Sequence, residues 1–152
     1  MLEQAFELMM TTSARAYFAQ DSWPERVWAA ARALCEGYAT YPAQFSCCFV
    51  EYASMGPPGV QLEHDRLMAF TLMLEDGYKQ REEAEQLPRV VSELIVSLLM
   101  EYPYREIRRG KPPDRFYDLV PPQTYAAIAP FIGPAEAGSF VQTKVEELKR
   151  EG

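Results

Sequence analysis

The residues that could carry chemistry in this chain are few, with one histidine and three cysteines among them. His64 stands in the charged segment EHDR (63–66), a setting typical of a solvated or ion-paired side chain on a helix surface. A zinc site would need further cysteine and histidine residues at ligand spacing. We therefore expect neither a metal site nor a cofactor.

The three cysteines, Cys35, Cys47 and Cys48, are an odd number without the spacing of a disulfide framework. This usage favours a reduced protein of the cytoplasm. Cys47 and Cys48 are neighbours, so on a helix their side chains diverge by about 100° and would form a poor redox pair. Cys48 shares an apolar face with Phe45 and Phe49, which favours a buried thiol.

The other common catalytic patterns are also missing. The segment GPPG (56–59) contains prolines and does not have the pattern of a phosphate-binding loop. Serine and threonine residues have no paired histidine that could activate them. A catalytic pair of carboxylates stays an alternative that the sequence leaves open, although most acidic residues fall on helix faces, where solvation is the ordinary state. We therefore expect a protein that is not an enzyme.

Composition indicates a single globular domain over residues 1–152, since 48% of the residues are hydrophobic and 24% are charged. The net charge of −7 argues against a broad nucleic-acid surface, because phosphate binding needs a basic face. The longest nearly apolar run, 67–74, is too short to cross a bilayer. The acidic start MLEQAFELMM does not resemble a secretory signal. We expect no membrane association.

Apolar residues recur at helical spacing along most of the chain, and no stretch alternates as a strand would. The fold is therefore predicted to be all-α, a bundle of about seven helices joined by short loops. Ser22 and Glu25 predict a capping box at the start of the second helix. The expected helices cover residues 2–19, 22–39, a stretch from 42, 61–80, 88–109, a stretch from 121 and a stretch from 134.

Two of these helices are expected to be central. The run 67–74 is apolar on almost all sides, which predicts a buried helix. The helix 88–109 is also broadly apolar, and we expect the rest of the chain to be arranged around it. One side would face the core, and the other a further helix or a second subunit. Pro103 removes the N–H group that would bond Leu99, so a kink or loosened turn is expected there.

Aromatic and methionine side chains are unusually frequent, and they either fill the core or line a cavity between helices. Tyr38, Phe70, Met73 and Tyr78 belong to this set. Thr71 is the polar residue within the apolar run, and its hydroxyl could bond its own helix or orient a ligand. The residues predicted to line a pocket for a small apolar ligand are Phe18, Trp28, Phe45, Cys48, Phe49, Tyr52, Met68, Thr71 and Leu72.

The helix 88–109 and the last helix carry more apolar surface than a monomer of this size needs to cover. An isologous homodimer would let one patch serve both subunits. The residues predicted at this interface are Val91, Leu94, Ile95, Leu98, Phe140, Val141 and Val145.

Several segments of the chain, in this order, resemble one family. SELIVSLLMEYPYREIRRGK (92–111) followed by LVPPQTYAAIAPFIGPAEA (119–137) is similar to the end of many bacterial tetracycline-repressor (TetR) family regulators. SWPERVWAAARAL (22–34) and YPAQFSCCFVEYASMGPPG (41–59) resemble the first two helices of that family's ligand domain. The resemblance covers nearly the whole chain and rests on the order of the pieces.

The resemblance implies a TetR C-terminal domain that forms a homodimer through a four-helix bundle and holds an inducer pocket within its first five helices. Residues 1–20 would be the linker helix from a helix-turn-helix domain that is missing from this chain. DNA would then be bound only through that N-terminal domain, whose two copies must match half-sites about 34–36 Å apart. Truncation and natural loss would both explain the missing domain.

Two hypotheses follow. The first is the ligand-sensing and dimerisation domain of a TetR-like transcriptional repressor, which binds a small apolar effector and does not bind DNA on its own. The second is a small all-α enzyme or carrier that acts on an apolar small molecule. An enzyme needs a convergent group of polar side chains in its cavity, whereas a regulator domain does not.

Overall fold

The computed structural model describes the backbone of residues 2–50 and 54–152, and the side chains of all of these except residues 2 and 48–50. This part of the chain contains eight α-helices and no strand, which confirms the predicted all-α class. The helices are α1 (Leu2–Phe18), α2 (Trp23–Thr40), α3 (Pro42–Val50), α4 (Pro57–Leu74), α5 (Glu82–Glu85), α6 (Val90–Arg108), α7 (Val120–Ile132) and α8 (Pro134–Glu151). Two 3-10 segments, η2 (Glu75–Lys79) and η3 (Pro113–Leu119), precede α5 and α7.

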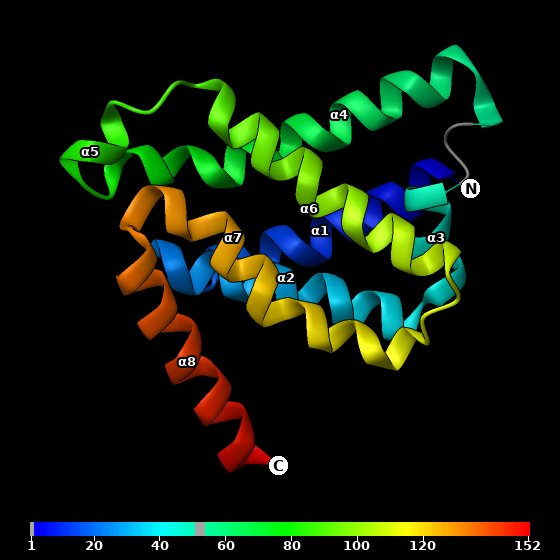
Figure 1. Ribbon diagram of the computed structural model, residues 1–152. Coiled ribbons are helices and arrows are strands. Elements are labelled where there is room, and N and C mark those ends of the chain that lie inside the picture. Colours follow the sequence, from blue (N-terminus) through cyan, green and yellow to red (C-terminus); the bar gives the residue numbers. More distant parts are fainter. Residues whose placement is uncertain (1, 51–53) are drawn as a thin grey trace.

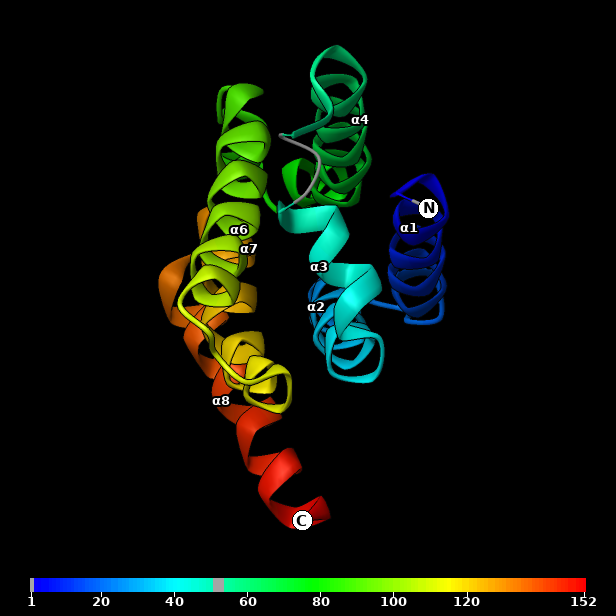
Figure 2. The same cartoon turned by 90° about the vertical axis from the view of Figure 1, so that its right-hand side faces the viewer.

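The helices form two layers (Figures 1 and 2). Helices α1 to α4 lie on one side, and α6 and α7 lie on the other, with α8 extending from the end of α7. Helix α2 packs against α1, α3, η3 and α7, so it joins the layers. The prediction that helix 88–109 is the central one was wrong. Helix α2 contacts elements of both layers, whereas α6 keeps Leu94 and Leu98 on an exposed outer face.

Helix α2 begins as its sequence predicts. The Ser22 hydroxyl accepts a hydrogen bond from the Glu25 N–H group at 3.4 Å, which satisfies one of the free donors of the first turn. Pro24 lies in that turn, where its missing N–H group has no consequence. The Ser22 half of the predicted capping box is therefore confirmed, whereas the Glu25 carboxylate pairs with Lys144 at 2.6 Å.

Helix α4 differs from its prediction in two ways. It begins at Pro57 because prolines suit a first helical turn, so residues 57–59 do not form a loop. It also lies at the edge of the fold, not at its centre. Phe70 and Leu74 are buried, but the side chains of Met68 and Leu72 are 41% and 67% exposed. Since α4 packs against α1 and α6 and not on all sides, Val60, Met68 and Leu72 remain on the surface.

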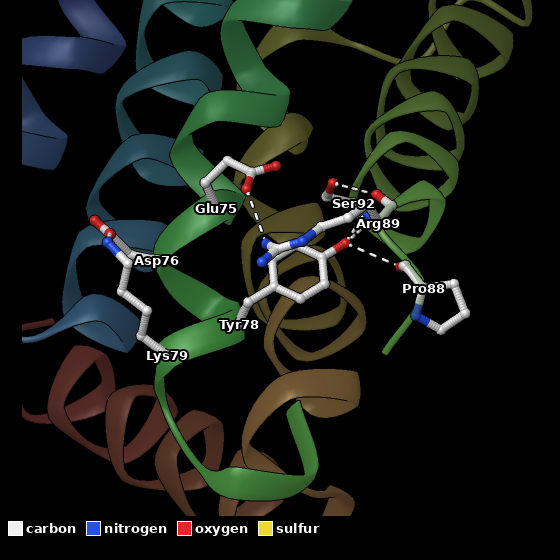
Figure 3. Close-up of polar contacts among 7 residues, drawn as sticks. All are labelled: Glu75, Asp76, Tyr78, Lys79, Pro88, Arg89 and Ser92. Carbon is white, nitrogen blue, oxygen red and sulfur yellow. Dashed lines mark hydrogen bonds and ion pairs between the residues drawn. The ribbon is translucent and has the colours of Figure 1, made fainter. Parts of the chain in front are cut away.

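The start of α6 is attached to η2 by Tyr78 (Figure 3). The Tyr78 hydroxyl accepts from the Ser92 N–H group at 3.1 Å and donates toward the carbonyls of Arg89 and Pro88, at 2.9 and 3.2 Å. The Arg89 guanidinium lies 4.3 Å from the centre of the Tyr78 ring. The short helix α5 lies between these segments. Its three glutamates are exposed, and the fully buried Ala84 packs inward.

The C-terminal part folds back onto the body, with Phe116 and Leu119 buried in η3. Helix α7 ends at Gly133, whose φ of 94° lies in the region that favours glycine, and α8 follows at Pro134. Ala137 is the buried residue of α8, and the rest of that helix is half-buried or exposed. Figure 1 shows α8 projecting from the bundle.

Candidate functional site

An apolar cavity of about 90 Å³ lies between the two layers. This is well above the roughly 10–15 Å³ that a single water molecule needs. Its walls come from α1, α2, α4, α6, η3 and α7. The lining residues are Tyr17, Val27, Ala30, Ala31, Leu34, Cys35, Tyr38, Phe70, Met73, Leu74, Val96, Leu99, Met100, Pro103, Phe116, Leu119, Gln123, Thr124 and Ala127.

The cavity follows from where large and small side chains fall along α2. Near the start of α2, Trp23 packs edge-on against Phe131 of α7, with ring centres 5.3 Å apart. Near its end, Tyr38 packs against Phe116, with ring centres 4.4 Å apart. Between these aromatic pairs the lining includes three alanines, Ala30, Ala31 and Ala127. The rings hold the layers apart, and the alanines do not fill the space between them.

Two of the polar side chains at the cavity already have partners. The Tyr17 hydroxyl donates to the Met73 carbonyl at 2.9 Å, and the indole N–H of Trp23 donates to the same carbonyl at 3.0 Å. Burial, with Asp76 nearby, raises the pKa of Tyr17, so its hydroxyl stays protonated at neutral pH. Gln123 Nε2 donates to the Leu99 carbonyl at 3.3 Å.

The Gln123 contact follows from Pro103. The proline cannot donate to the Leu99 carbonyl four residues earlier, and α6 nevertheless continues to Arg108. The amide of Gln123 on α7 supplies the missing donor. It therefore ties α7 to α6 at the wall of the cavity.

Thr124 and Cys35 differ from these engaged groups. Thr124 is fully buried, and its Oγ1 has no hydrogen-bond partner among the residues that the structure describes. Cys35 is 5% exposed, and burial raises its pKa from 9.0 to about 12, with Lys111 acting in the opposite direction. The thiol is therefore protonated at neutral pH and is a poor nucleophile.

The described residues of the lining are mainly apolar. Among the residues that the structure describes, the lining includes no Asp, Glu, His, Lys or Arg. Within the described ranges, no three His, Cys, Asp or Glu residues are grouped to hold a metal ion. His64 is exposed on α4, where a solvated histidine was predicted. None of the described helices is both long and apolar enough to cross a membrane.

The residues predicted to line a pocket are not those of this cavity. Phe18, Met68 and Leu72 are 71%, 41% and 67% exposed. Thr71 is buried, and its hydroxyl donates to the Leu67 carbonyl at 2.7 Å. Of the two roles predicted for this hydroxyl, the structure shows the bond within its own helix.

The remaining predicted pocket residues lie away from this cavity or outside the residues that the structure describes. Trp28 lines a polar cleft between α2 and α8, and Phe45 packs against Gly37 between α2 and α3. Tyr52 and the side chains of Cys48 and Phe49 lie outside the described residues.

Part of the lining was visible in the sequence. Tyr38, Phe70 and Met73 belong to the aromatic and methionine set, and all three line the cavity. Thr124 was missed, although it occupies a polar position in the helical stripe that continues through Ile128 to Phe131. A polar residue that interrupts a buried stripe is the signal that could have identified it.

The predicted interface residues fall into three groups. Leu94 and Leu98 are 58% and 70% exposed, and with Val90 and Tyr102 they form an exposed apolar stripe along α6. Ile95, in contrast, is 8% exposed and belongs to the core, so it offers little surface to a second copy. The other four, Val91, Phe140, Val141 and Val145, are half-buried.

Comparisons with known proteins found no match for this chain. No protein-family model, characterised protein or solved structure matches the chain significantly. The resemblance to TetR regulators therefore rests on the sequence segments described above.

Proposed function

We propose that this chain is the ligand-sensing and dimerisation domain of a TetR-like transcriptional repressor, with a small apolar effector bound in the cavity. The observation that carries the proposal is that α6 has two different apolar faces. Val96 and Met100 on its inner face line the cavity, whereas Leu94 and Leu98 on its outer face form exposed apolar surface. One helix thus connects a candidate ligand site with a candidate subunit interface.

A second copy of the chain is the occupant that we propose for the outer face. Exposed leucines one helical turn apart, such as Leu94 and Leu98, are typical of a helix that packs against another helix. Phe140, Val141 and Val145 on the projecting helix α8 would widen the contact into a four-helix bundle. A stable interface of this kind buries more than about 1,200 Å² in total.

The ligand would act by favouring one arrangement of α6 relative to α7. Both helices contribute to the cavity wall, and the hydrogen bond from Gln123 to the Leu99 carbonyl joins them there. A ligand shifts an equilibrium only through a difference in its affinity for the two states. A molecule wedged between these helices can have such a difference, since their spacing changes its contacts directly.

An enzyme is the less favoured function. The described residues of the cavity lining include no charged side chain, and the buried Cys35 thiol is protonated at neutral pH. Neither general acid–base catalysis nor nucleophilic attack has a residue prepared for it. A protein that only senses a ligand needs neither.

Sedimentation of matched leucine variants tests the subunit contact. Leu98→Glu places a charge on the outer face of α6, and Leu72→Glu places one on α4 at a similar exposure of 67%. We expect the wild type and Leu72→Glu to sediment as dimers and Leu98→Glu as a monomer. A monomeric wild type in dilute solution, or a dimer that tolerates Leu98→Glu, would contradict the proposal.

A further inference from the structure

We propose that the cavity selects a small neutral molecule with one hydroxyl or carbonyl group, which forms a hydrogen bond with Thr124 Oγ1. The inference deepens the proposed function, since it names the class of ligand for the same cavity. It rests on a lining that is apolar apart from a few polar groups, and on which of those groups already have a hydrogen-bond partner.

Thr124 differs from three other threonines in the helices. The hydroxyls of Thr12, Thr71 and Thr143 each donate to the carbonyl four residues earlier, at 2.7, 2.7 and 3.0 Å. Thr124 makes no such bond within the described part of the chain, although it is completely buried. A buried hydroxyl without a partner is unfavourable, so a ligand that supplies one gains affinity from it.

The other groups restrict the ligand further. Tyr17 and the amide of Gln123 already donate to backbone carbonyls. Tyr38 also lines the cavity, but Thr124 Oγ1 is the lining hydroxyl that is buried without a partner among the described residues. A charged ligand would lose its hydration in a lining whose described residues include no charged side chain, which is strongly unfavourable. The polar part of the ligand should therefore be single and neutral.

The volume limits the apolar part. An engineered apolar cavity of roughly 150 Å³ accommodates benzene, and the cavity here measures about 90 Å³. A short aliphatic chain fits this space better than a ring system. Short alcohols and ketones are the class that satisfies both the volume and Thr124.

The test uses probes of matched size with the full chain. 1-Butanol and n-pentane have the same number of non-hydrogen atoms, and butylammonium adds a charge. Their dissociation constants are measured by NMR titration for the wild type, Thr124→Val and Thr71→Val. Valine keeps the shape of threonine without its hydroxyl, and Thr71 is a buried threonine outside the cavity whose hydroxyl is bonded within its own helix.

We expect Thr124→Val to weaken 1-butanol binding about five- to tenfold, the equivalent of one hydrogen bond. It should leave n-pentane binding unchanged, and Thr71→Val should alter neither affinity. Butylammonium should not bind. Equal responses of 1-butanol and n-pentane to Thr124→Val would overturn the inference while leaving an apolar ligand site in place. Failure of both probes to bind the wild type would instead count against the cavity as a ligand site, and so against the proposed function.

Discussion

Cys35 shows how burial changes the properties of a single side chain. Removing the thiolate from water raises its pKa from 9.0 to about 12 in the folded protein, whereas in the unfolded chain it returns toward the ordinary value. Below about pH 9 the thiol is protonated in both states and contributes no pH dependence. Between about pH 9 and 12 the unfolded state loses the proton first, so the free energy of unfolding falls as the pH rises.

We therefore predict that Cys35→Ala reduces the alkaline loss of stability. Denaturant unfolding at about pH 8 and about pH 11 gives the change in the free energy of unfolding for each protein. Burial also raises the pKa of Tyr17 and Tyr38, so part of the loss will remain in the variant. Cys47→Ala, at a half-buried position, is the control. An alkaline loss in Cys35→Ala as large as in the wild type would contradict the prediction.

Two glycines in helices should respond oppositely to alanine. A Cβ atom at Gly37 would lie too close to the Phe45 ring, whereas one at Gly138 would have no neighbour within 4 Å. Alanine in a helix is favoured over glycine by about 0.5–1 kcal/mol, but overpacking costs about 1–3 kcal/mol. We expect Gly138→Ala to raise the melting temperature and Gly37→Ala to lower it. If Gly37→Ala were also stabilising, the close packing of α2 and α3 described here would be wrong.

At the level of elements, Tyr78 determines where α6 begins. Its hydroxyl is the partner of the Ser92 N–H group, which lies in the first turn of α6, where helical partners are missing. Tyr78→Phe would keep the ring beneath Arg89 and remove only the hydroxyl. The buried N–H group would then lack a partner, at a cost of about 1–3 kcal/mol in the free energy of unfolding.

The measurement for Tyr78→Phe is denaturant unfolding beside Lys79→Ala. Lys79 forms an exposed ion pair with Asp76 at 3.0 Å, and pairs of this kind contribute about 0–1 kcal/mol. The free energy of unfolding of Lys79→Ala should therefore be close to that of the wild type. Hydrogen exchange should also quicken at Ser92 in Tyr78→Phe and stay unchanged in Lys79→Ala. Equal free energies of unfolding for Tyr78→Phe and Lys79→Ala would show that the Tyr78 hydroxyl does not stabilise the start of α6.

The helices were predictable from sequence, but their positions in the bundle were not. Periodicity and caps are local signals, and they located α2 through Ser22 and α8 through Gly133 and Pro134. Which helix lies in the centre depends on contacts between distant segments. The run 67–74 is apolar on nearly all sides, yet Leu72 is 67% exposed because α4 lies at an edge.

The cavity was harder to predict for the same reason. It exists because aromatic pairs at both ends of α2 hold the layers apart, and the partners Phe116 and Phe131 are far from α2 in sequence. The sequence prediction favoured the largest side chains, such as Phe18 and Trp28. The space itself is created by small residues, and Ala30 and Ala127 carry no signal of their own.

At the scale of the whole molecule, charge limits the partners of the isolated chain. The net charge is −7, and the cations gathered at the end of α6 are partly neutralised there. Arg109 and Lys111 both pair with Glu106 at 3.6 Å, and Arg108 lies over the Tyr104 ring at 5.3 Å. Binding to DNA needs several uncompensated cations facing successive phosphates.

We therefore predict that the isolated chain forms no specific complex with DNA. A gel-shift titration with the upstream promoter region should show no salt-sensitive shift, since affinity that depends on phosphate contacts falls steeply with salt. Glu106→Gln frees Arg109 and Lys111 from their carboxylate partner, so weak binding without sequence preference should appear in this variant at low salt. That response would identify charge as the limiting factor. A sequence-specific shift of the wild type at moderate salt would show that this domain reads DNA itself, contrary to the prediction.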